Sequence, residues 1–144
     1  TSGFGLVKRL ALGADICYSA RGMMMALGCI QARKCNSNDC PVGVTTQNPK
    51  LTWALVPEEK SNRVYNFHHN TVKSACEIMG AMGLEKTEDL KPWHLMRRIE
   101  AYEIQNLSEI YEFIEEGSLL KDPKPENYAR ACDAARSDSF TEIS

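Results

Sequence analysis

The start of the chain has a helical spacing of apolar positions, and the residues concerned are Phe4, Val7, Leu10 and Ala11. Gly13 follows where a helix-terminating glycine belongs. The segment over 14–18 is predicted to form a short buried strand. Ser19 then precedes a second apolar stretch as an N-cap, which predicts a helix over 20–34. Helix, strand and helix in this order are typical of repeating β/α architecture, so we expect an α/β fold class.

The rest of the chain is helical in pattern. Apolar residues at spacings of three and four predict a long helix that begins near Pro57 and ends before Gly83. Three shorter helices are predicted over 92–98, after a capping box of Asn106 with Glu109, and over 125–136.

Composition excludes several classes of function. Of the 144 residues, 43% are hydrophobic and 25% are charged, as in an ordinary soluble domain. The net charge of −2 gives no field that favours nucleic acid, and no apolar run reaches the about 20 residues of a membrane span. Six cysteines without a visible secretory leader predict a reducing compartment, the cytoplasm. Residues 1–50 carry a net charge of +4 and residues 51–144 one of −6, and the basic part would suit an anionic phosphate or simply a solvated face.

Three cysteines stand close together, Cys29, Cys35 and Cys40, at spacing C-x5-C-x4-C with Pro41 after the last. Iron–sulfur clusters are held by cysteine thiolates, and a cysteine followed by proline recurs among such ligands. The spacing leaves other interpretations open. Zinc would need a fourth ligand, from His68, His69 or a distant cysteine. A disulfide and three inert buried thiols are the remaining alternatives.

Two predicted helix starts carry residues that suit an anion. Ser2 and Gly3 precede the first helix, and Ala20, Arg21 and Gly22 begin the second. Unpaired N–H groups and the positive end of the helix dipole favour a phosphate there, and an arginine adds a charged hydrogen bond. A plain cap by the preceding serine and a solvated guanidinium would explain the same residues.

A longer run of motifs carries a family resemblance. These motifs are Leu12-Gly13-Ala14-Asp15, Ala26-Leu27-Gly28-Cys29-Ile30, Cys35, Cys40-Pro41-Val42-Gly43-Val44 and Thr46-Gln47. Together they resemble the FMN-binding domain of glutamate synthase. The remainder is similar, more loosely, to the C-terminal end of the shorter, stand-alone glutamate synthase-like proteins. Ser19-Ala20-Arg21 also resembles those shorter homologues, because large subunits carry Gly-Thr in place of Ala20-Arg21.

The resemblance implies a fold and its cofactors. Residues 1–50 would be the end of an FMN-binding (β/α)8 TIM barrel, with its last strand and flanking helices, and residues 51–144 a helical C-terminal extension. Cys29, Cys35 and Cys40 would ligate a [3Fe-4S] cluster. The FMN phosphate would be held by Ser2, Gly3, Ala20, Arg21 and Gly22. One strand cannot close a barrel, so we expect the remaining strands to come from the same or another polypeptide.

The resemblance also implies an activity. The chain would be part of an oxidoreductase that reduces 2-iminoglutarate, formed from 2-oxoglutarate and ammonia, to glutamate, with electrons passed through the cluster to FMN. The expected partners are the small-molecule substrate and an electron donor, either ferredoxin or an NAD(P)H-oxidising subunit, and neither nucleic acid nor membrane. No catalytic residue can be named from the sequence. The alternatives are the same cofactors with a different substrate, and a non-catalytic, zinc-stabilised assembly module.

Overall fold

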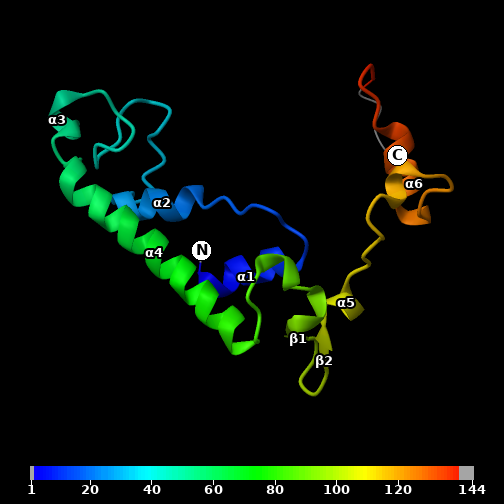
Figure 1. The fold of residues 1–144 in the computed structure, drawn as a ribbon. Coiled ribbons are helices and arrows are strands. Elements are labelled where there is room, and N and C mark those ends of the chain that lie inside the picture. Colours follow the sequence, from blue (N-terminus) through cyan, green and yellow to red (C-terminus); the bar gives the residue numbers. More distant parts are fainter. Residues whose placement is uncertain (1, 140–144) are drawn as a thin grey trace. The chain divides into compact units, whose positions relative to one another are not determined.

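The structure is a computed structural model that describes residues 2–139, and it forms two compact units that divide between Leu107 and Ser108 (Figure 1). The first unit holds α1 (Gly3–Ala11), α2 (Ala20–Leu27), α3 (Pro49–Thr52), α4 (Pro57–Ala81), the 3-10 turns η1 (Thr87–Asp89) and η2 (Pro92–His94), and the strands β1 (Met96–Arg98) and β2 (Ile104–Asn106). The short helix α5 (Leu107–Ile110) begins at the division. The second unit holds η3 (Ser118–Leu120) and α6 (Glu126–Ala134), which contact each other.

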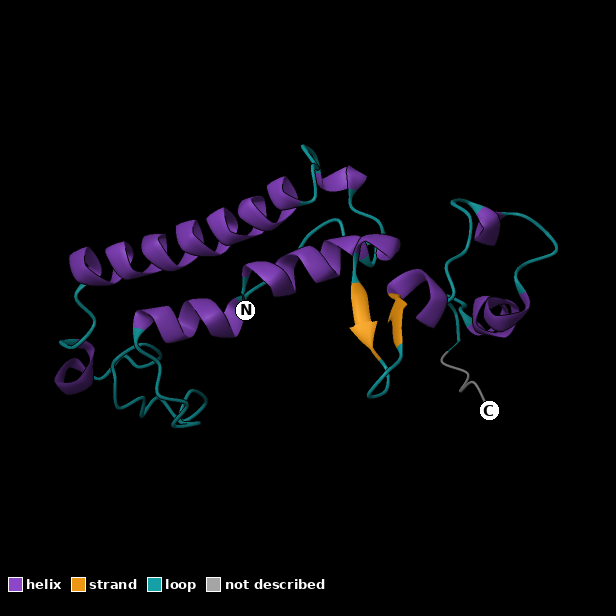
Figure 2. Ribbon diagram, turned by 90° about the horizontal axis from the view of Figure 1, so that it is seen from below, coloured by secondary structure: helices purple, strands orange, loops and turns teal. Residues whose placement is uncertain are grey.

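The long helix α4 organises the first unit, because both α1 and α2 pack along it (Figure 2). Pro57 occupies its first turn, as the sequence predicts, and acidic residues follow at the positive end of the helix dipole. Of the apolar stripe predicted for α1, Val7 and Ala11 are buried and Leu10 is half-buried, whereas Phe4 is 53% exposed. The buried apolar residues of this unit are few: Val7, Ala11, Cys40, Ala75, Met79, Leu90, Leu95 and Leu107.

Two glycines let the starts of α1 and α2 approach α4 closely. A Cβ on Gly3 would lie 2.6 Å from the backbone nitrogen of Ala75 and 2.5 Å from the hydroxyl oxygen of Ser74. A Cβ on Gly22 would lie 2.9 Å from the ring of Phe67. Any side chain at these positions would force the helices apart, since the interior has no free volume to accept it.

The helix predicted over 20–34 is too long. It ends at Leu27 because Gly28 adopts a left-handed conformation with φ of 107°. The Gly28 N–H bonds to the carbonyl oxygen of Met25 at 2.9 Å, and the Cys29 N–H bonds to that of Met24 at 3.0 Å. These bonds satisfy the last carbonyl groups of α2 and turn the chain into an irregular loop.

The strand predicted over 14–18 is also not formed. No strand pairs with this segment among residues 2–139, and the side chains of Ile16 and Tyr18 are 71% and 91% exposed. A strand requires a partner for its backbone N–H and C=O groups, and the described chain offers none here. The structure is therefore a mixture of helices with a small sheet, compatible with part of an α/β fold.

The helix predicted over 92–98 is replaced by the turn η2 and the hairpin of β1 and β2. The strands are antiparallel, with Met96 opposite Asn106. The Leu107 N–H bonds to the carbonyl oxygen of Leu95 at 3.0 Å, and both leucine side chains are buried. This long-range pairing decides the local structure, and a spacing pattern within one segment cannot reveal it.

The remaining predicted helices are present with changed lengths. α4 ends at Ala81, and Gly83 follows with φ of 75°. The capping-box helix is reduced to α5, whereas α6 matches the helix predicted over 125–136 closely. Within the described part of the chain, no helix is both long enough and apolar enough to cross a membrane.

Candidate functional site

The loop between α2 and α3 gathers the three motif cysteines. Cys29, Cys35 and Cys40 line one cavity of about 30 Å³, together with apolar side chains of α2 and of the segment after Cys40. Cys40 is buried, Cys29 half-buried and Cys35 exposed. All six cysteines of the chain are free thiols, so no disulfide holds the loop. The structure thus brings the three predicted ligands to one place.

Backbone donors surround two of the three sulfur atoms. The Gln31 N–H donates to Cys29 Sγ at 3.4 Å. Backbone N–H groups, that of Thr45 first and those of Val42 and Val44 more weakly, lower the pKa of the Cys40 thiol to about 7. Such donors favour the thiolate, which is the form that binds a metal.

The cysteine loop also contains unusual backbone conformations. Gln31, Arg33 and Asn38 have φ of 57°, 56° and 62°, and they are the non-glycine residues with positive φ among residues 2–139. Such conformations cost free energy and persist only where the surroundings impose them, which makes them characteristic of binding sites. All three of these residues lie between Cys29 and Cys40.

Asn38 closes the loop onto the segment before α3. Its side-chain oxygen accepts the Gln47 N–H at 2.8 Å, and its carbonyl oxygen accepts the Thr46 hydroxyl at 2.5 Å. Asn48 then caps α3 through the Lys50 N–H at 3.0 Å. The loop is therefore fixed by polar contacts at its Cys40 end, although its side chains offer little apolar surface.

Gly43 allows the turn after Cys40 to pack. Its φ is 76°, and its N–H bonds to the Cys40 carbonyl oxygen at 3.2 Å. A Cβ at this position would lie 2.4 Å from the Leu51 carbonyl oxygen. Only glycine tolerates both this conformation and this close approach to α3. The Cys40-Pro41-Val42-Gly43 motif thus packs against α3 through Gly43.

We expect Asn38→Ala to loosen the cysteine loop. The variant loses the bond to Gln47, worth about 0.5–1.5 kcal/mol, and places alanine in a left-handed conformation that costs a further 1–2 kcal/mol or so. Hydrogen exchange over 36–48 should quicken. Asn38→Gly is the matched control, because it loses the same bond without the backbone cost. Its rate of hydrogen exchange should lie between those of the wild type and Asn38→Ala. Equal protection in wild type and Asn38→Ala would refute the role of the bond.

The zinc interpretation finds no support in this arrangement. Within residues 2–139, no three His, Cys, Asp or Glu side chains converge as one metal ion requires. His69 stacks on Tyr65 of α4 with ring centroids 5.6 Å apart, and His68 lines a different cavity. A mononuclear zinc site needs all its sulfur and nitrogen atoms within about 2.0–2.3 Å of one point.

The candidate phosphate residues occupy two helix starts. Ser2 caps α1 by accepting the Gly5 N–H at 3.1 Å on its side-chain oxygen, and Gly3 is buried against α4. Ala20, Arg21 and Gly22 form the first turn of α2, with Ala20 and Arg21 exposed. Figures 1 and 2 both show the start of α1 beside the start of α2. The positive ends of two helix dipoles therefore lie near each other.

A groove links the start of α2 to the cysteine loop. It has a volume of about 330 Å³, and its lining residues are Arg21, Met24, Met25, Cys29, Gln31, Arg33 and Cys35. Arg21 and two of the cysteines thus face one space. Sequence reasoning missed Arg33, Gln31 and Thr45, because their contribution depends on loop geometry and no spacing pattern marks them.

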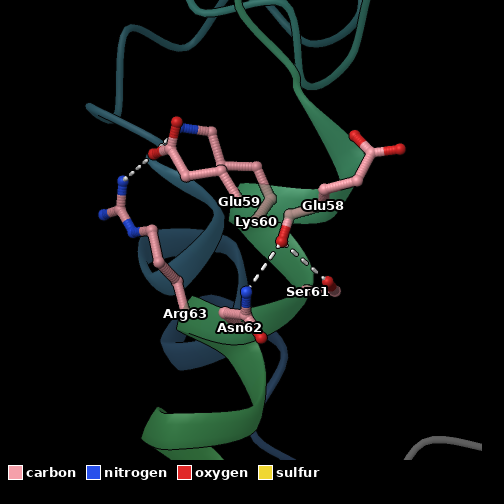
Figure 3. Close-up of polar contacts among 6 residues, drawn as sticks. All are labelled: Glu58, Glu59, Lys60, Ser61, Asn62 and Arg63. Atoms are coloured by element: carbon pink, nitrogen blue, oxygen red, sulfur yellow. Dashed lines mark hydrogen bonds and ion pairs between the residues drawn. The ribbon is translucent and has the colours of Figure 1, made fainter.

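A polar network at the start of α4 borders the end of α2 (Figure 3). The Glu59 carboxylate accepts a bond from Lys60 Nζ at 3.0 Å and lies 4.0 Å from Arg63 Nη1. The hydrogen bond from Lys60, then its charge and that of Arg63, lower the pKa of Glu59. A Cβ on Gly28 would lie 3.9 Å from Arg63 Nη1. The Arg63 guanidinium, paired with Glu59, therefore lies near Gly28 at the C-terminal end of α2.

The comparison with protein families identifies the class. Residues 1–85, which include the helix starts and the whole cysteine loop, match the conserved region in glutamate synthase. The chain belongs to the glutamate synthase family.

Three relatives illustrate the match. The chain is 40% identical over 106 residues to the glutamate synthase large subunit-like protein YerD of Bacillus subtilis, covering 73% of this chain and 20% of the relative. It is 37% identical over 86 residues to an archaeal-type glutamate synthase (NADPH) of Thermotoga neapolitana, covering 60% of this chain and 17% of the relative. It is 35% identical over 79 residues to a glutamate synthase (NADH) of Schizosaccharomyces pombe, covering 55% of this chain and 4% of the relative. The chain thus spans a fifth or less of the length of these relatives. No solved structure matches it.

Proposed function

We propose that this chain forms the cluster-binding and phosphate-binding end of a glutamate synthase-type oxidoreductase. The observation that carries the proposal is the cavity lined by all three motif cysteines, inside the segment that matches the family. In this proposal residues 1–50 are the end of the FMN-binding TIM barrel, and residues 51–144 are its extension. The exposed, unpaired segment over 14–18 would meet the neighbouring strands of the barrel.

Cys29, Cys35 and Cys40 would hold a [3Fe-4S] cluster. The N–H groups directed at Cys29 and Cys40 would balance the negative charge of the thiolates. The first turns of α1 and α2, with Arg21, would hold the FMN phosphate. When bound, the two cofactors supply the electron transfer by which 2-iminoglutarate, formed from 2-oxoglutarate and ammonia, is reduced to glutamate. The chain's own contribution is to bind and orient them in a fixed relation.

The groove between Arg21 and Cys35 supports this division of roles. A continuous space joins the proposed phosphate end to the proposed cluster end, and α2 connects both along its length. The other partners would be an electron donor, either ferredoxin or an NAD(P)H-oxidising subunit, and the enzyme would act in the cytoplasm.

The proposal is tested on the assembled enzyme, meaning this chain together with the segments or chains that complete it. Anaerobic preparations should contain iron, acid-labile sulfide and FMN, with the EPR signal of a three-iron cluster. Turnover with 2-oxoglutarate and ammonia should yield glutamate. Zinc without sulfide would overturn the cluster, and full cofactor content without glutamate formation would favour the alternative in which the substrate differs. The second outcome, a different substrate, is worth measuring because this chain has Ala20-Arg21 where large subunits carry Gly-Thr.

We expect Arg21→Ala to weaken FMN binding by about 1–3 kcal/mol if the guanidinium bonds to the phosphate. A flavin titration of the assembled apoenzyme measures this change. Arg33→Ala is the matched control, because Arg33 lines the same groove at the cysteine end. Gly22→Val is a poor probe of the phosphate, since its side chain would strike Ser19 and Phe67. Unchanged affinity in Arg21→Ala would move the phosphate elsewhere.

A further inference from the structure

Arg33 is the charged residue that lines both spaces of the cysteine loop. It lines the cavity of about 30 Å³ that the three motif cysteines share, and it also lines the groove of about 330 Å³ that begins at Arg21. Of these two spaces, Arg21 lines the groove and Lys34 the cavity. Arg33 therefore lies where the two spaces meet, together with Cys29 and Cys35, which line both as well.

No carboxylate balances the charge of Arg33. Its guanidinium makes no ion pair and no side-chain hydrogen bond within residues 2–139. Neither space has an aspartate or a glutamate among its lining residues, and apolar side chains such as Met24 and Val44 contribute to the lining. A charge beside apolar groups interacts more strongly with its neighbours than one surrounded by water. The charge of Arg33 is therefore available to whatever the cysteines bind.

The backbone at this position does not call for an arginine. Its φ is 56°, a left-handed conformation that glycine and asparagine adopt with less strain. An arginine here thus adds strain without adding a contact to the fold, and strained residues of this kind cluster at functional sites. The long cationic side chain is what distinguishes it from the residues that this turn would otherwise favour.

We propose that the Arg33 guanidinium raises the reduction potential of the cluster held by Cys29, Cys35 and Cys40. The inference rests on the proposed function. When one electron passes from the electron donor to the cluster, the cluster with its thiolates gains one negative charge, and no bond of the chain forms or breaks. A nearby positive charge stabilises the reduced, more negative form more than the oxidised form. Removal of that charge should therefore lower the potential.

The test compares Arg33→Gln with Arg33→Lys in the assembled enzyme. Both variants keep an unbranched side chain on the left-handed backbone, so they differ mainly in charge. Lys50→Gln is the matched control, because it removes the same charge from an exposed residue of α3 that lines neither space. The readout is the midpoint potential of the cluster in an EPR-monitored redox titration at low and high salt, together with iron and sulfide content.

We expect Arg33→Gln to shift the reduction equilibrium about three- to tenfold toward the oxidised form, which lowers the potential by about 28–59 mV for one electron. The difference should shrink at high salt, which screens an exposed charge. Arg33→Lys and Lys50→Gln should keep the wild-type potential. A loaded Arg33→Gln protein with wild-type potential would overturn the inference and leave the proposed function intact. A wild-type enzyme without iron and sulfide would overturn both.

If Arg33→Gln fails to retain the cluster, the lysine variant decides. Wild-type iron content and potential in Arg33→Lys would support the charge as the active feature. Loss of the cluster in Arg33→Lys as well would overturn the inference, because it would assign the effect to the shape of the arginine side chain. A loaded Arg33→Lys protein with a lowered potential would also overturn it, since the charge alone would then not set the potential.

Discussion

Replacing Cys40 by serine should empty the cluster site of the assembled enzyme, with iron and acid-labile sulfide falling to background. Cys40 is the buried thiol of the three, and its low pKa of about 7 favours the ligating thiolate. A serine hydroxyl stays protonated at neutral pH and is a harder ligand than iron–sulfur chemistry requires. We expect the same loss, for the same reason, in Cys35→Ser.

Cys76→Ser provides the matched control for these variants. Cys76 is an exposed thiol on α4, outside the loop, and its replacement should leave iron and sulfide unchanged. If Cys40→Ser retained the wild-type metal and sulfide, Cys40 would not be a ligand. Proteolysis of the emptied proteins should begin between Cys29 and Asn38, because polar contacts to Thr46 and Gln47 still hold the loop beyond that point.

The second large effect is expected for Gly3→Ala, which should destabilise the first unit by about 1–3 kcal/mol. The new methyl group would stand 2.6 Å from the Ala75 backbone nitrogen, and a backbone atom cannot move aside as a flexible side chain can. α1 would have to retreat from α4 and loosen the buried contacts of Val7. Thermal unfolding of the assembled apoenzyme, combined with hydrogen exchange of α1, measures the change.

Gly80→Ala is the control, and its expected effect has the opposite sign. Gly80 lies in the last turn of α4, and a Cβ there would meet nothing within 4 Å. Alanine should stabilise the helix by up to about 0.5–1 kcal/mol. A Gly3→Ala protein with wild-type unfolding but weaker FMN binding would show that Gly3 serves the phosphate and not the packing of α1.

Apolar spacing and helix-end residues predicted the helices, because a helix is determined mainly by residues close together in the sequence. The stripe that includes Val7 and Ala11 gave α1, and the proline at the first turn with the spacing that follows gave α4. The hairpin of β1 and β2 escaped prediction because it depends on the pairing of residues 96–98 with residues 104–106, which the apolar spacing within either segment does not show. The strand over 14–18 failed for a related reason, since no described segment pairs with it.

The candidate site also contains residues that the sequence revealed and residues that only the structure revealed. Cysteine spacing located Cys29, Cys35 and Cys40, because ligand types are visible in a sequence. The donors around them were invisible, because the bond from the Gln31 N–H to Cys29 Sγ depends on the folded path of the loop and not on the residue type. Thr45 was equally hidden beside Thr46, because the two threonines differ only in what the folded loop places next to each.

The long helix α4 sets a limit on how this chain can vary. Phe67 contacts the start of α2 and Ala75 contacts the start of α1, about two helical turns apart on the same face. Insertion or deletion of one residue between them would rotate one contact by about 100° relative to the other. Homologues can therefore exchange side chains along this stretch, but a change of its length would dismantle the alignment of both helix starts. Alignments of the family should place their gaps elsewhere.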